Sequence, residues 1–144
     1  MHKDIAVTLF TVFITMLAGC TPQPEAIKVG VDNCSFCKMT ISDNKFGAEI
    51  LTTKGKVYKF DDAHCILSFL QSKLLEPKEI KEMYLTDFAG QHSLIKTNET
   101  FLFKSDALKT PMSGNIAAFS NKDSMLKFKE QFNGSAVEWT DLIK

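Results

Sequence analysis

Sulfur-bearing side chains gather in one short stretch of this sequence. The segment Cys34-Ser35-Phe36-Cys37-Lys38-Met39 holds two thiols and one thioether. Thiolate and thioether sulfurs are soft, polarizable donors that select Cu(I) over hard cations such as Mg²⁺ and Ca²⁺. If the chain is extended at Cys37 and Met39, both side chains lie on one face, since residues i and i+2 share a face of a strand. The pattern indicates a two- or three-coordinate site for a soft metal ion.

A further sulfur donor is expected from the second half of the chain. Met112 lies in Pro111-Met112-Ser113-Gly114, whose residue types are typical of a loop. Met83 and Met125 lie within apolar patterns instead, and we assign both to the core. The alternative is that Met112 also fills the core, as methionines often do.

The cysteines also allow other interpretations. A C-x-x-C pair in an exported protein often forms a disulfide, so Cys34 and Cys37 are alternatively the thiols of a thiol–disulfide redox protein. Against this, a thioredoxin-type site opens a helix directly after its C-x-x-C, whereas Lys38 to Ile41 favours an extended chain. Cys65 falls on the apolar face of an expected helix and is interpreted as a small buried hydrophobe. His64 is expected to be an exposed residue of the first helical turn.

Most other chemistries lack their motifs. There is no second C-x-x-C and no H-x-x-x-H for a structural zinc site. No G-x-S-x-G, P-loop or dinucleotide glycine pattern is present, and we expect a protein that is not an enzyme. The 144 residues carry 17 basic and 17 acidic side chains, and every basic one is lysine. Without arginine or net positive charge, nucleic-acid binding is not expected.

The N-terminus has the features of an export signal. Residues 5–18 form an uncharged apolar run that is shorter than the roughly 20 residues of a membrane span. The sequence Leu17-Ala18-Gly19-Cys20 follows and resembles the lipobox of bacterial lipoproteins. We expect a signal peptide over residues 1–19, acylation of Cys20, and a tether over residues 20–26. This anchors the protein to a bacterial membrane, facing the periplasm or cell exterior; a plain cleaved signal is the alternative.

Periodicity and turn residues place the expected elements. Asp61 and Asp62 are a helix cap, and Lys54-Gly55 is the turn of a hairpin. Strands are expected at 27–31, 47–53, 56–60, 83–88, 100–103, 116–119 and 136–139, and helices from the Asp61–Asp62 cap to about Leu74 and over about 122–132.

The two halves of the chain resemble each other. A shift of 59 residues places Gly55 on Gly114 and Phe60 on Phe119, and the expected order of elements matches as well. We therefore predict an α+β fold of two related ββαβ-like units packed together, spanning about 27–80 and 81–144. Neither unit can bury much core alone, so their shared interface should be apolar.

The order and spacing of several short motifs resemble the NosL family of lipoprotein copper chaperones, over nearly all of the mature chain. The motifs are the lipobox ending at Cys20, Cys37-Lys38-Met39, Gly47-Ala48-Glu49, Gly55-Lys56, Phe60-Asp61-Asp62, the strand 84–88, and the methionine loop before Ala117–Phe119. The resemblance implies two similar ββαβ units over residues 27–144. It also implies one bound Cu(I), delivered toward the copper centres of nitrous oxide reductase together with a membrane ABC-type complex.

The resemblance also implies the ligands. The family's cysteine, the methionine two residues on, and a methionine from the second half correspond to Cys37, Met39 and Met112. Many members have one cysteine before that methionine, whereas this chain has Cys34 as well. Cys34 is either a fourth copper ligand or a disulfide partner for Cys37. Cys65 is also additional.

Overall fold

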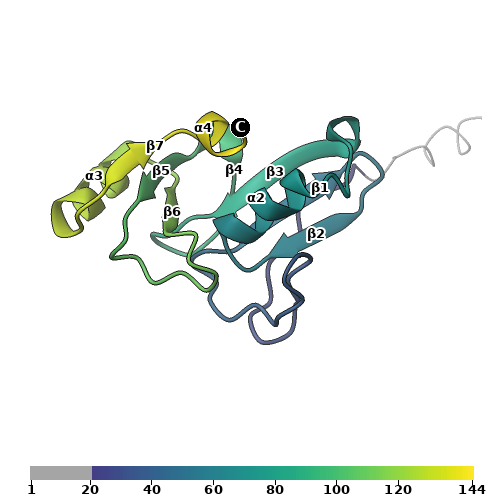
Figure 1. Cartoon of the computed structure of the whole chain (residues 1–144), viewed down its shortest axis with the longest axis horizontal. Coiled ribbons are helices and arrows are strands. Elements are labelled where there is room, and N and C mark those ends of the chain that lie inside the picture. Colours follow the sequence, from purple (N-terminus) through teal and green to yellow (C-terminus); the bar gives the residue numbers. More distant parts are fainter. Residues whose placement is uncertain (1–20) are drawn as a thin grey trace, which may run out of the picture.

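The computed structural model describes residues 21–144, which form two β-sheets, each covered by one helix (Figure 1). The predicted signal peptide and Cys20, its predicted lipidation site, lie outside the described residues. Within residues 21–144, no helix is both long and apolar enough to cross a membrane.

The first unit is a four-stranded antiparallel sheet in the order β2-β1-β3-β4, with helix α2 on one face. Its elements are β1 (Ala48–Thr52), β2 (Val57–Phe60), α2 (Ala63–Gln71), the 3₁₀ turn η1 (Pro77–Glu79), β3 (Ile80–Thr86) and β4 (Leu94–Lys96). The helix packs through its buried residues Cys65, Ile66 and Phe69, and the Phe69 ring lies 5.1 Å from that of Phe60.

Helix α2 begins where the sequence predicts. The side chain of Asp62 accepts the backbone N–H of Cys65 and caps the helix, satisfying one of its unpaired N-terminal donors. The helix ends at Gln71, three residues before the predicted Leu74, and Lys73 follows with a left-handed φ of 55°.

The second unit is a three-stranded antiparallel sheet in the order β6-β5-β7, packed against helix α3. Aromatic rings fill its core, where Phe128 contacts the rings of Phe103 and Phe119. After the 3₁₀ turn η2 (Thr97–Glu99), its elements are β5 (Phe101–Lys104), β6 (Ile116–Phe119), α3 (Lys122–Gln131), β7 (Ser135–Val137) and the short helix α4 (Trp139–Leu142).

The predicted internal repeat and the α+β fold are confirmed. Strand β6 and the start of α3 lie 59 residues after β2 and the start of α2, and the cap Asp62 has its counterpart in Asn121. Each unit runs β-β-α-β with its first strand at the centre of its sheet. The first sheet also takes in β4, so the boundary between the sheets falls after Lys96 rather than near residue 80.

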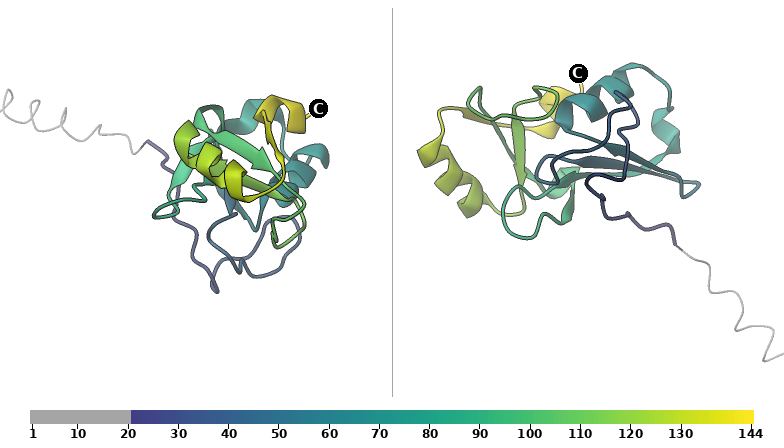
Figure 2. Two further views of the ribbon diagram at one scale, coloured as in Figure 1. Left: turned by 90° about the vertical axis from the view of Figure 1, so that its left-hand side faces the viewer. Right: turned by 90° about the horizontal axis from the view of Figure 1, so that it is seen from below.

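The two units share a core. A parallel bridge joins Asp87 to Ala118, and the N–H of Phe88 donates to the Ala118 carbonyl at 2.7 Å. One buried apolar cluster contains residues of both units, including Ile66 from α2 and Ile116 from β6. The expected apolar interface is therefore present, and the right-hand view of Figure 2 shows the units side by side.

Two predicted strands differ from the structure, and one observed strand is absent from the prediction. The expected strand 27–31 is wrong: Gly30 has a φ of 76°, and the Lys28 carbonyl accepts the N–H groups of Val31 and Asp32, so the chain turns. The last strand ends at Val137, because Trp139 already belongs to α4. Strand β4 was not predicted, since Leu94–Lys96 is too short for an alternating pattern to stand out.

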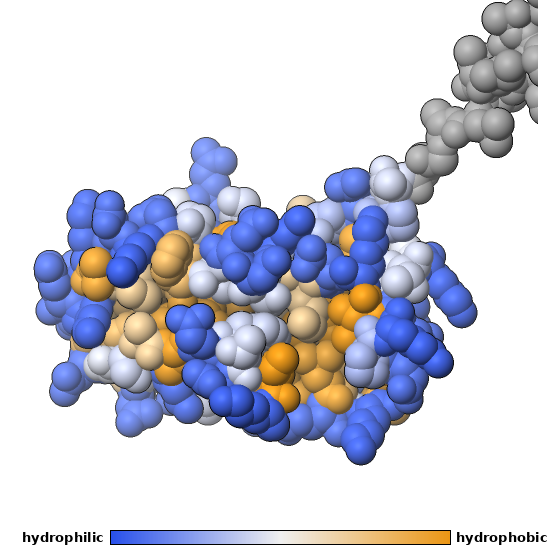
Figure 3. All heavy atoms as spheres, turned by 90° about the horizontal axis from the view of Figure 1, so that it is seen from above, coloured by the Kyte–Doolittle hydropathy of each residue, from blue (hydrophilic) through white to orange (hydrophobic). Residues whose placement is uncertain are grey.

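An apolar groove runs over the side of the molecule formed by α2, η1 and α4, where Figure 3 shows hydrophobic residues between hydrophilic ones. Its apolar lining comes from Leu67, Leu70, Leu75, Pro77, Ile80, Met83 and Ile143.

Candidate metal centre

The segment from Cys34 to Met39 forms a tight, ordered loop. The Cys34 N–H donates to the Met39 carbonyl at 2.8 Å, and the Lys38 N–H donates to the Cys34 carbonyl at 3.0 Å. Lys38 has a left-handed φ of 67°, and an isolated bridge joins Asn33 to Thr40. These contacts bring the ends of the loop together and place the C-x-x-C pair against the end of β2, where the Ser35 N–H donates to the Lys59 carbonyl.

Three cysteine sulfurs meet beside this loop. The Sγ atoms of Cys34, Cys37 and Cys65 all lie within 4.8 Å of one another, and all three thiols are free. Cys34 is 1% exposed, Cys65 is 0% exposed and Cys37 is half-buried. Three sulfurs at metal–sulfur distances of about 2.3 Å around one ion are roughly 4 Å apart. The cysteine cluster, meaning these three residues, is therefore close to the spacing that a single ion needs.

Cys65 is a candidate ligand that the sequence pattern does not indicate. It is buried on the apolar face of α2, as expected, but its sulfur also reaches the Cys34–Met39 loop. Helical periodicity predicts which face of the helix a residue lies on, but not which other segment packs against that face. One sequence feature could have indicated its role: Cys65 lies in the first turn of α2, directly after strand β2, which contacts the cysteine loop.

The cluster favours a single thiolate. The pKa of Cys34 is lowered to about 5, first because the Cys65 thiol donates a hydrogen bond to its sulfur. Burial opposes this effect, and backbone N–H groups of Cys37, Asp61 and Phe36 add to it. The same hydrogen bond raises the pKa of Cys65, and burial raises that of Cys37. A lowered thiol pKa in the cluster suits a soft cation, because the thiolate is the form that binds metal.

Asp62 joins the second unit to this centre. Its Oδ1 caps α2 through the Cys65 N–H at 3.1 Å, and its Oδ2 accepts the N–H groups of Met112 at 3.0 Å and Gly114 at 3.2 Å. A Cβ on Gly114 would lie 2.9 Å from the His64 backbone nitrogen, so only glycine fits this approach. The loop that carries Met112 is thus fixed at the end of α2 where Cys65 lies.

The comparisons with known proteins agree with this arrangement. The NosL family profile matches residues 27–144. The chain belongs to the NosL family. Among solved structures, the copper chaperone NosL from Shewanella denitrificans has 24% sequence identity and a TM-score of 0.67, covering 84% of this chain and 96% of that one. A search of curated proteins gave no match. NosL membership confirms the predicted family, and the likeness to the solved structure is one of fold.

In this NosL chain, the four predicted ligands are not all placed alike. Cys34 and Cys37 come together, with Cys65 as the third member of their group. Met112 is half-buried and packs against the core that contains Cys34 and Cys65. Met39 is 57% exposed, at the end of the cysteine loop. The ligand roles of all four residues stay predictions.

The two described histidines lie outside the cysteine cluster. His64 is exposed, as expected, with its Nε2 3.4 Å from the Ser68 hydroxyl. The Nδ1 of His92 lies 2.9 Å from the Asp87 carbonyl oxygen. The NosL centre of this chain therefore offers sulfur rather than imidazole.

Proposed function

We propose that this protein is a membrane-anchored, extracytoplasmic carrier that binds one Cu(I) ion and passes it to a copper-site assembly. The observation that carries the proposal is the group of three cysteine sulfurs within 4.8 Å, two of them buried. Such soft donors favour Cu(I), and membership of the NosL family supports copper as the cargo. The related protein from Shewanella denitrificans is itself named as a copper chaperone.

The ion is held by Cys34, Cys37 and Cys65. Met39 and Met112 act as thioether donors while the ion enters or leaves the site. Cys34 and Cys65 are buried and hold the metal against water, whereas Cys37 is half-buried and Met39 is exposed. A partner's sulfur or imidazole groups can approach from that exposed side and replace these ligands one at a time. Methionine forms no disulfide, which suits an oxidising compartment.

The client in this proposal is nitrous oxide reductase, with the ABC-type maturation complex as the membrane partner. Both follow from the NosL resemblance. Acylation of Cys20 would keep the carrier at the membrane where that complex resides.

A thiol–disulfide redox function fits the geometry less well. A redox enzyme needs an accessible thiolate, because the thiolate attacks the substrate disulfide. Here the group with the lowered pKa, Cys34, is 1% exposed, and the accessible group, Cys37, has a raised pKa. A redox enzyme requires the lowered pKa at the accessible cysteine, whereas here it belongs to the buried one.

Competition with a Cu(I) chelator tests the carrier proposal. The full chain should show one tight site, and Cys37→Ser, Cys34→Ser and Cys65→Ser should each weaken it by more than the 10–100-fold typical of an outer-shell change. Met39→Ala and Met112→Ala should weaken it less. Met125→Leu, in the core of the second unit, is the matched methionine control and should leave it unchanged. If the three serine variants bind copper like the parent, the proposal is wrong.

A further inference from the structure

The chain enters the first unit at a defined end of its sheet. Lys81 donates from Nζ to the Pro22 carbonyl at 2.9 Å. The Pro22 ring also packs on the β1–β2 turn, 3.4 Å from where a Cβ on Gly55 would lie. The first described residues therefore lie beside the β1–β2 turn and the start of β3, at the right-hand end of the sheet in Figure 1.

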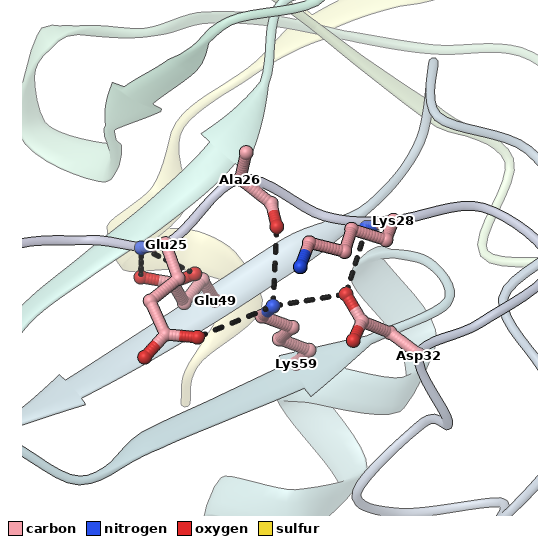
Figure 4. Close-up of polar contacts among 6 residues, drawn as sticks. All are labelled: Glu25, Ala26, Lys28, Asp32, Glu49 and Lys59. Atoms are coloured by element: carbon pink, nitrogen blue, oxygen red, sulfur yellow. Dashed lines mark hydrogen bonds and ion pairs between the residues drawn. The ribbon is translucent and has the colours of Figure 1, made fainter.

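From this entry point, residues 22–32 cross the sheet face opposite α2 as a fixed strap. The Glu25 N–H donates to both oxygens of the buried Glu49 carboxylate, at 3.1 and 3.2 Å. Lys59 lies directly opposite Glu49 in the β1–β2 ladder. Its Nζ donates to the Ala26 carbonyl at 3.1 Å and to Asp32 at 2.9 Å (Figure 4). These contacts fix the orientation of the first sheet relative to residues 22–32.

Exposed lysines gather at the same end. Helix α2 runs back toward it from Asp62, and the Thr53 N–H donates to the Glu79 carbonyl at 2.9 Å, which joins η1 to the β1–β2 turn. We call this end the basal surface; its exposed side chains include Lys54, Lys56, Lys73, Leu74, Lys78 and Lys81. The acidic side chains Glu76, Glu79 and Glu82 lie among or beside these five lysines, so the described part of this surface carries an excess of positive charge, although the whole chain has a formal charge of zero.

The cysteine cluster lies at the other end of the sheet. Strand β2 leads from Lys56 in the turn to Asp61, whose N–H hydrogen bonds to the Cys34 sulfur. Five residues of extended chain span about 16 Å at 3.3 Å per residue. The basal surface and the metal centre therefore face in different directions.

We propose that the basal surface rests on an anionic phospholipid bilayer, so that the cysteine cluster points away from the membrane toward soluble partners. Lysines near anionic headgroups tighten membrane association, and one acyl group together with a basic patch gives stable anchoring. Leu74, 71% exposed within the patch, would lie at the boundary of headgroups and acyl chains. The proposed orientation rests on the proposed anchoring at Cys20, whereas the lysine patch is observed independently of that anchoring.

Hydrogen exchange of the full chain on vesicles tests this orientation. On phosphatidylcholine vesicles containing phosphatidylglycerol, amides of residues 53–56 and 72–79 should exchange several-fold more slowly than in detergent. Amides of residues 34–39 should be unchanged. The protection should fall on pure phosphatidylcholine and in 1 M salt, where the Debye length is about 3 Å.

A matched pair of variants isolates the charge. Lys54→Gln/Lys73→Gln/Lys78→Gln should lose the protection, whereas Lys122→Gln/Lys127→Gln/Lys129→Gln on α3 should keep it. Protection of residues 34–39, or an equal loss in both variants, would overturn the proposal. Mass spectrometry reports separately whether the chain is acylated. If an unacylated chain also fails to bind anionic vesicles at low salt, the proposed membrane contact of the basal surface is wrong. Copper titration of the same samples distinguishes this failure from a failure of the carrier function.

Discussion

The carboxylate of Asp62 accepts the backbone N–H of Met112 at 3.0 Å, although 50 residues separate them. One oxygen of Asp62 caps α2 and the other holds the Met112 loop, so a single side chain joins the end of α2 that carries Cys65 to the loop that carries Met112. The two repeated units therefore meet at the proposed copper site as well as in the core.

Replacing Asp62 should weaken both the fold and the site. Asp62→Ala removes a helix cap and leaves the N–H groups of Met112 and Gly114 without their acceptor, which should cost about 2–4 kcal/mol of unfolding free energy. Urea unfolding measures this. Asn121→Ala, at the equivalent cap of α3, is the matched control and should cost about 1 kcal/mol without changing copper affinity. Equal copper binding by Asp62→Ala and the parent would show that the loop plays no part in the site.

Copper should stabilise the folded protein by linkage. A ligand at 100 times its Kd adds about 2.7 kcal/mol to the unfolding free energy when it binds only the native state. Thermal unfolding with and without Cu(I) measures this gain. Met112→Ala should reduce the gain while leaving the melting temperature of the copper-free protein nearly unchanged, because Met112 is only half-buried. A full gain in that variant would remove Met112 from the ligand set.

Alkylation should report the order of exposure in the cysteine cluster. Cys37 should react first with a maleimide, because it is half-buried while Cys34 and Cys65 are buried. Bound copper should slow that reaction. Peptide mass spectrometry after short exposure identifies the modified residue, and earlier labelling of Cys34 would favour the redox interpretation instead.

Glu49 should give stability a distinct pH dependence. Burial raises its pKa to about 7, from about 4.3 in the unfolded chain. The native state therefore binds more protons between these values, and the unfolding free energy should fall as pH rises, by up to roughly 3 kcal/mol from this group. Comparing Glu49→Gln with the parent at pH 5 and pH 8 isolates the effect. A difference between the two proteins that does not change with pH would contradict it.

Local chemistry in the sequence was sufficient to predict much of the fold. The Lys54-Gly55 turn, the Asp62 cap and the 59-residue repeat predict the hairpin, α2 and the two-unit plan, because each depends on neighbouring residues. The course of the segment around residues 27–31 was not predictable, since its flanking residues Ala26 and Asp32 are held by Lys59, which is distant in sequence.

The candidate site was predictable only in part. Cys34 and Cys37 are identified by their spacing, whereas Cys65 reads as a core residue until tertiary packing brings its sulfur to theirs. Equally, nothing local to Met112 indicates that Asp62 holds its backbone.

X-ray absorption of the copper-loaded full chain tests the central claim most directly. Cu(I) should be coordinated by sulfur alone, at about 2.3 Å, and the sulfur coordination should fall in Cys65→Ser. Met125→Leu should give the parent spectrum. Nitrogen or oxygen donors in the first shell, or an unchanged spectrum in Cys65→Ser, would contradict a metal held by the three clustered cysteines.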